Sequence, residues 1–163
     1  MEVGVLLDYA TNPGVLAAFG AAIGVSLAGI GASTGLGISG STAAALTAEQ
    51  EKNFVKILII EVAPQTQVLY AFVVSTFILN GIMGGQLTTT QGFMCLAAGI
   101  CVGLSGLTAI SQGKAASAAI AAYGRNNTIP FKVLVYVVMC EISAILGFIT
   151  GLLILISAKV IGG

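Results

Sequence analysis

The stretch GVLAAFGAAIGVSLAGIGASTGLGISGSTAAAL occupies residues 14–46 and contains no charged side chain. A helix needs about 20 apolar residues to cross the hydrocarbon core of a bilayer. This stretch is therefore long enough to span a membrane and to tilt or project into water. Three further apolar stretches follow at about 54–79, 92–122 and 131–158. The sequence predicts an all-α membrane protein with four transmembrane helices.

The overall composition supports a lipid environment. Of 163 residues, 57% are hydrophobic and only 7% are charged, and the mean hydropathy is +1.05. Soluble domains carry about a quarter charged residues, so membrane lipids must contact most of this surface. A soluble enzyme is excluded, and any catalysis is expected to belong to partner subunits. The net charge is zero, which argues against a nucleic-acid partner.

The basic residues predict the orientation in the cell membrane. Five of the six flank the polar connections at 47–53 and 124–130, and one lies near the C-terminus. Cytoplasmic loops carry an excess of Lys and Arg. We therefore expect both connections to be cytoplasmic, and both termini and the middle connection to lie outside. The five residues are Lys52, Lys56, Lys114, Arg125 and Lys132.

The two halves of the chain resemble each other. A shift of about 76 residues pairs Lys56 with Lys132 and Phe72 with Phe148. Such internal similarity indicates a duplicated structural unit. We predict two antiparallel hairpins, residues 1–80 and residues 81–163.

The first helix of each hairpin carries stripes of small residues at four-residue spacing. Such stripes let helix backbones approach closely in a membrane. They could serve packing within one four-helix bundle, or they could form the narrow side of a wedge that closes a ring of copies. The stripes are Gly20, Gly24 and Ala28; Gly31, Gly35 and Ser39; Gly99 and Gly103; and Gly113 and Ser117.

Only two carboxylates lie inside the predicted spans, Glu61 and Glu141. Ionisable groups at membrane depth are costly and usually functional. Glu141 lies near mid-membrane, so it must be protonated, bound to a cation or paired with another chain. This residue is the strongest functional signal in the sequence.

The segment EVAPQTQVLY, residues 61–70, places polar groups on one helix face. Ala63, Thr66, Gln67 and Tyr70 follow the spacing i, i+3, i+4 and i+7. Pro64 lacks an N–H and disturbs the helical hydrogen bonds around it. Nearby backbone carbonyls can therefore be free to act as ligands.

Residue counting places three polar side chains at a similar depth. Gln67, Gln112 and Glu141 each lie roughly 11 to 15 residues from a cytoplasmic connection, at 1.5 Å per residue. One carboxylate among neutral oxygen donors suits a hard, singly charged cation such as Na⁺. The alternative is that these amides only form hydrogen bonds between helices.

Glu61 is less informative. On an ideal helix it lies opposite the polar face and shares its side with Gln65, the counterpart of Glu141 in the repeat alignment. The first hairpin therefore lacks a mid-membrane acid of its own. We interpret Glu61 as a hydrogen-bonding group or as part of an access path.

Three motifs carry a resemblance to a known family: PQTQVLYAF (64–72), GLTAISQGKAA (106–116) and EISAILGF (141–148). With them, the chain resembles the rotor-ring proteolipids of V-type ATPases, and among these the subunit K of bacterial sodium pumps. The resemblance extends over all four predicted helices.

This resemblance implies a Na⁺ site. Its ligands would be Glu141, Thr66, Gln67, Gln112 and the backbone carbonyl of residue 63. Tyr70 would bond the glutamate and close the site. Two features depart from the family pattern: Ala63 replaces a bulkier residue, and Glu61 is not part of the family's site.

The resemblance also implies a mechanism. Copies of the chain would form a ring attached to a central stalk at the cytoplasmic connections. ATP hydrolysis in other subunits would turn the ring, and an arginine of a stator subunit would displace the ion from Glu141. Two alternatives stay open: a proton-carrying proteolipid of the same fold, and a small exporter of organic cations.

Overall fold

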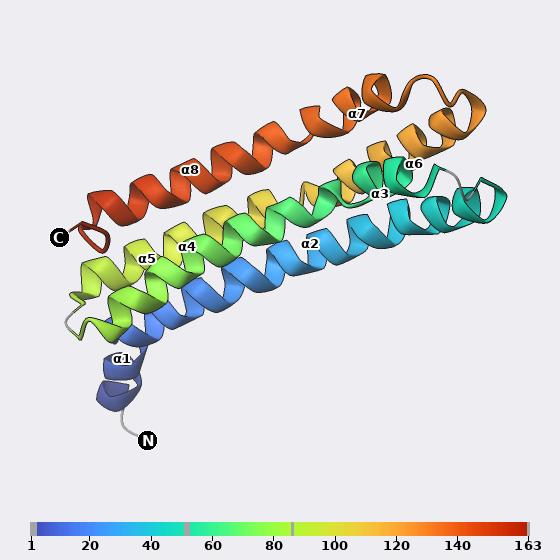
Figure 1. Cartoon of the computed structure of the whole chain (residues 1–163). Helices are drawn as coiled ribbons and strands as arrows, with labels where there is room; N and C mark the ends of the chain where they lie inside the picture. The colour runs from blue at the N-terminus through green and yellow to red at the C-terminus, as the bar shows by residue number, and fades with distance from the viewer. Residues whose placement is uncertain (1–2, 51–52, 86, 163) are drawn as a thin grey trace.

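The computed structural model describes residues 3–50, 53–85 and 87–162. Lys52, one of the predicted cytoplasmic cations, lies outside them. Within the described residues all regular secondary structure is helical (Figure 1). The elements are α1 (Val3–Thr11), α2 (Pro13–Glu49), α3 (Phe54–Glu61), the 3₁₀ helix η2 (Ala63–Gln65), α4 (Thr66–Met83), α5 (Thr89–Gly106), α6 (Ala109–Arg125), α7 (Pro130–Met139) and α8 (Glu141–Ser157).

These elements form the predicted membrane spans. Pro13–Glu49, Phe54–Met83 and Thr89–Arg125 are each long and apolar enough to cross a bilayer. The pair α7 and α8 gives a fourth span, bent by 41° at the break between them. The prediction of an all-α membrane fold is confirmed. The last three spans are broken, however, and of these breaks the sequence predicted only the one at Pro64.

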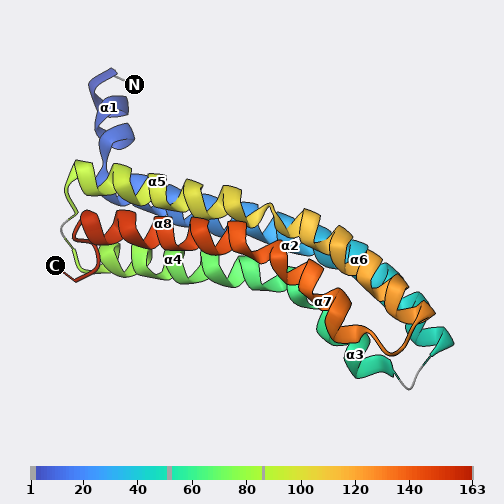
Figure 2. The same cartoon turned by 90° about the horizontal axis from the view of Figure 1, so that it is seen from above.

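The helix α1 has no counterpart among the predicted helices. It ends just before Asn12, whose side-chain oxygen accepts a hydrogen bond of 3.2 Å from the backbone N–H of Val15. Pro13 begins α2, where the fixed φ angle of proline suits the first helical position. This cap starts α2 in a new direction, and α1 turns away from the bundle (Figure 2).

The stripes of small residues bring α2 against α5 and α6. A β-carbon on Gly99 would collide with the backbone of Gly20, and one on Gly113 would collide with the backbone of Gly35. The stripes are therefore used for packing within one chain. The wedge interpretation stays a prediction.

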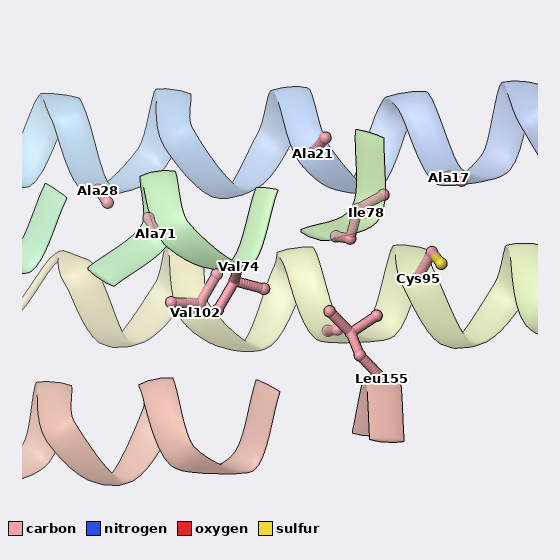
Figure 3. Packing of buried hydrophobic residues seen from close by; sticks show 10 residues of the cluster. Ala17, Ala21, Ala28, Ala71, Val74, Ile78, Cys95, Val102 and Leu155 are labelled. Atoms are coloured by element: carbon pink, nitrogen blue, oxygen red, sulfur yellow. The ribbon is translucent and has the colours of Figure 1, made fainter. Parts of the chain in front are cut away.

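A hydrophobic core lies between α2, α4, α5 and α8 (Figure 3). Alanines on α2 face larger side chains on α4, α5 and α8. The buried residues are Ala17, Ala21, Ala28, Ala71, Val74, Ile78, Cys95, Ala98, Val102 and Leu155. A second cluster at the other end of the bundle joins α2, α3, α6 and α7.

Hydrogen bonds tie together the two polar connections at that end. The hydroxyl of the fully buried Tyr123 donates to Asn53 Oδ1 over 2.8 Å. Asn53 Nδ2 donates to Gln50 Oε1 over 2.9 Å, and Gln50 Nε2 donates to the Gly124 carbonyl over 3.0 Å. The first connection is therefore fixed to the end of α6.

Candidate functional site

The helix breaks bring polar side chains from three spans to one place. Thr66 is the first residue of α4, Glu141 is the first residue of α8, and Gln112 lies in the first turn of α6. Glu141 is 9% exposed, Gln67 1% and Gln112 0%. The four side chains thus form a buried polar cluster inside an otherwise apolar bundle.

Glu141 accepts hydrogen bonds on both carboxylate oxygens. Its Oε1 lies 2.5 Å from Thr66 Oγ1, and its Oε2 lies 2.6 Å from Gln112 Nε2. Bonds this short are typical of charge-assisted contacts. The described residues contain no ion pair to Glu141, so neutral donors alone contact the carboxylate.

The hydroxyl of Thr66 has too few hydrogens for its neighbours. It lies 2.9 Å from the Ala63 carbonyl and 2.5 Å from Glu141 Oε1. A hydroxyl donates a single hydrogen, so two acceptors can share it only in a three-centre bond. A proton on Glu141 or a cation between the oxygens would satisfy both contacts fully.

Gln67 provides a further oxygen. Its Nε2 donates to Gln112 Oε1 over 2.8 Å, whereas its own Oε1 is buried and has no partner among the described residues. An unpartnered buried acceptor costs about 1–3 kcal/mol. The orphaned oxygen therefore fits a cation ligand better than a group that only links helices.

Tyr70 lies beside this cluster. Its phenol is next to Glu141 and Thr66, although no hydrogen bond of standard geometry from it occurs among the described residues. Its ring stacks on Phe148, with ring centroids 5.2 Å apart and planes inclined by 25°. Phe148 therefore packs against the ring of a tyrosine that neighbours the carboxylate.

Two of the highlighted residues lie outside the cluster. Gln65 is half-buried in η2. Glu61 ends α3, and its backbone carbonyl accepts a hydrogen bond of 3.1 Å from Ser39 Oγ. Its side chain faces a groove along α2. Neither residue contacts Glu141 through a hydrogen bond in the described structure.

The structure also adds two groups that the sequence did not reveal. Gln112 Nε2 lies 3.3 Å from the carbonyl of Val137, which belongs to the last turn of α7. The same carbonyl accepts the backbone N–H of Cys140 over 3.2 Å, and a carbonyl oxygen has two lone pairs, so it can serve Gln112 as well. The second group is Phe148, which supports Tyr70.

Together, the fold and this cluster define a small membrane protein that surrounds one buried carboxylate with neutral oxygen and nitrogen groups. The family of ATP synthase C subunits matches the chain twice, at residues 19–78 and 96–154. The chain therefore belongs to this family.

Two relatives agree with this assignment. The A-type ATP synthase subunit K of Methanocaldococcus jannaschii is 38% identical over 145 residues, which are 89% of this chain and 64% of that protein. This chain thus matches less than two thirds of the archaeal protein's length. The V-type sodium ATPase subunit K of Enterococcus hirae is 34% identical over 157 residues, which are 94% of this chain and all of that protein. The resemblance to rotary-ATPase proteolipids is confirmed, and such a proteolipid is a non-catalytic subunit.

Proposed function

We propose that the chain is a rotor-ring subunit that carries Na⁺ across the membrane on Glu141. The observation that carries this proposal is the convergence of Glu141, Thr66 and the orphaned Gln67 Oε1 in one buried cluster. The name of the Enterococcus hirae relative, a V-type sodium ATPase subunit, agrees with sodium as the cargo.

The donor set suits Na⁺. Hard cations prefer oxygen ligands, and a carboxylate with one Na⁺ is neutral, so the loaded site avoids the cost of a buried charge. Gln67 Oε1 is free to bind, whereas Gln112 Oε1 accepts a hydrogen bond from Gln67 Nε2, so Gln112 would join the ligands only after both amides reorient. The ligands would be Ala63 (carbonyl), Thr66, Gln67, Gln112 and Glu141, with Tyr70 closing the site.

The ring would work with partner subunits. Copies of the chain would assemble side by side, and a central-stalk subunit would contact the cytoplasmic connections at 47–53 and 124–130. A stator arginine would displace the ion from Glu141 as each copy passes. Moving one charge against 100 mV costs about 2.3 kcal/mol. One acid per four helices lowers the number of ions per turn and allows a steeper gradient.

A proton is the second candidate cargo. The 2.5 Å contact between Thr66 and Glu141 also fits a protonated Glu141 that donates to Thr66, which then donates to the Ala63 carbonyl. This arrangement satisfies Thr66 but leaves Gln67 Oε1 without a partner among the described residues. Sodium would use all of these oxygens, so we favour it. Membership of the family of ATP synthase C subunits favours both cargoes over a small cation exporter.

Carbodiimide labelling of the purified ring tests this proposal, because the reagent modifies protonated carboxyl groups. We expect Na⁺ to suppress modification of Glu141 at a fixed pH. Glu141→Gln should abolish the labelling, whereas the matched variant Glu61→Gln should leave sodium protection unchanged. Labelling that responds to pH but not to Na⁺ would identify a proton carrier instead.

A further inference from the structure

Glu61 lines a groove that the proposed ion site does not use. The groove runs between α2 and α3 with a volume of about 570 Å³. Its floor is formed by the small residues Gly40, Ala43 and Ala44 of α2. The carboxylate lies over Gly40, with Oε1 3.5 Å from the place where a β-carbon would be. The groove can therefore accept a bulky side chain that ends in a hydrogen-bond donor.

Such a side chain lies on the opposite flank of the molecule. Tyr136 of α7 lines a shallow pocket together with Ala118 and Ala122 of α6, and it is 73% exposed. Tyrosine combines a large apolar ring with a hydroxyl that seeks a partner when it is buried. In the isolated chain this hydroxyl would face lipid.

The groove and the tyrosine lie at the same depth. Glu61 precedes Thr66, the first residue of α4, by five residues, and Tyr136 precedes Glu141, the first residue of α8, by five residues. The hydrogen bond between Thr66 and Glu141 shows that α4 and α8 begin at the same depth in the bundle. Equal residue counts along two helices then give similar depths.

The internal repeat predicts how the two flanks meet. The shift of about 76 residues relates Tyr136 to Ile60, and Val137 to Glu61. Within one chain Ile60 and Val137 belong to the same core cluster, where α3 approaches α7. Where the pattern continues around a ring, α7 of one copy approaches α3 of the next. In that contact between copies, Tyr136 of one copy takes the position that Ile60 has within a single chain. Glu61 of the next copy takes the position that Val137 has within a single chain.

We propose that Tyr136 of each copy inserts into the α2–α3 groove of the next copy and donates a hydrogen bond to Glu61. The proposal rests on the ring proposed above and identifies the contact that sets its direction. A head-to-tail interface of this kind uses two different flanks and closes into a ring when the rotation fits. The bond would also give Glu61 a partner inside an apolar interface, where an unpartnered carboxylate is costly.

Cysteine cross-linking of the assembled ring tests the contact. In a background with Cys95→Ala, Cys101→Ala and Cys140→Ala, the pair Glu61→Cys and Tyr136→Cys should give a ladder of covalent oligomers after mild oxidation. Two control pairs combine Tyr136→Cys with Ile59→Cys on the exposed side of α3, or Glu61→Cys with Lys114→Cys on α6. Both control pairs should remain monomeric on denaturing gels.

The outcomes separate this inference from the proposed function. If native gels show an intact ring but oxidation gives no ladder of covalent oligomers, the Tyr136 contact is overturned and the proposed ring is not. This result is expected if lipid fills the groove. A ladder only from the Lys114 pair likewise overturns it. If the chain without any substitution forms no ring of any size on native gels, the proposed function itself is overturned.

A second measurement tests the hydrogen bond in the chain with its natural cysteines. Tyr136→Phe and Glu61→Ala should each lower the temperature at which the ring dissociates. The double variant should dissociate at about the same temperature as Glu61→Ala alone, because both changes remove one shared bond. Independent, additive shifts would contradict the bond.

Discussion

At the scale of single residues, the cluster around Glu141 contains more hydrogen-bond acceptors than donated hydrogens. The Thr66 hydroxyl contacts two oxygens with one hydrogen, and Gln67 Oε1 receives none from the described residues. In a buried site both deficits are costly. The proposed monovalent cation would remove both, because it attracts oxygens and needs no hydrogens.

Replacement of Thr66 tests this account. Thr66→Ala removes a proposed ligand from the site, at an expected cost of about 1–3 kcal/mol. Because about 1.4 kcal/mol corresponds to a tenfold change in affinity, we expect Na⁺ affinity to fall roughly 5- to 150-fold. The readout is the Na⁺ concentration that gives half-maximal protection of Glu141 against carbodiimide. Thr66→Ser keeps the hydroxyl and should stay within a few fold of the natural chain; equal losses in both variants would contradict the ligand role.

Much of this site could be predicted from residue spacing. The i, i+3, i+4 pattern placed Thr66 and Gln67 on one helix face, and counting from the charged connections placed Gln112 and Glu141 at the same depth. The Val137 carbonyl could not be predicted, because the break at Cys140 contains neither Pro nor Gly. The break is a consequence of tertiary packing rather than of local sequence.

At the scale of helices, close backbone contact holds α2 against α5 and α6. Adding a β-carbon at Gly113 would push the backbone of Gly35 away. Overpacking of a well-packed interior typically costs about 1–3 kcal/mol. We expect Gly113→Ala to destabilise the chain by at least this amount. The measurement is the heating midpoint at which the fully buried Cys95 reacts with a thiol-specific dye.

A matched glycine controls for helix propensity. At Gly29, the nearest atom to an added β-carbon is a methyl carbon of Val68 at 4.0 Å, an ordinary contact. Gly29→Ala should keep or raise the midpoint, because alanine favours helix by about 1 kcal/mol over glycine. If Gly113→Ala and Gly29→Ala behave alike, close contact at Gly113 is not what holds these helices together.

The helices themselves were only partly visible in the sequence. Length and apolarity located all four spans to within a few residues, and Pro64 indicated the break between α3 and α4. The break between α5 and α6 lies at Leu107 and Thr108, after a glycine that packs against Ala28. Many other glycines in this chain lie inside unbroken helices, so Gly106 alone could not predict a break.

At the scale of the whole molecule, the family model matches the chain in two segments, residues 19–78 and 96–154, and the predicted hairpins that contain them differ in chemistry. The second hairpin carries Glu141 where the first carries Gln65, and the first carries Glu61 where the second carries Val137. Under the proposed function, one copy would therefore supply one ion-carrying acid for four helices. In the proposed ring, the same divergence gives each copy two unlike flanks, which fixes one direction of assembly.

The orientation of the whole molecule is a prediction of its own. The excess of Lys and Arg around the connections 47–53 and 124–130 predicts that these lie on the cytoplasmic side. In a background without the natural cysteines, Ala48→Cys and Asn127→Cys should react with a membrane-impermeant maleimide only in inverted vesicles. Thr90→Cys at the start of α5 should react only in right-side-out vesicles. These side chains are exposed in the single chain, so labelling reports sidedness rather than burial. The opposite pattern would place the connections that we propose to bind the stalk outside the cell, and the proposed coupling to ATP hydrolysis would fail with it.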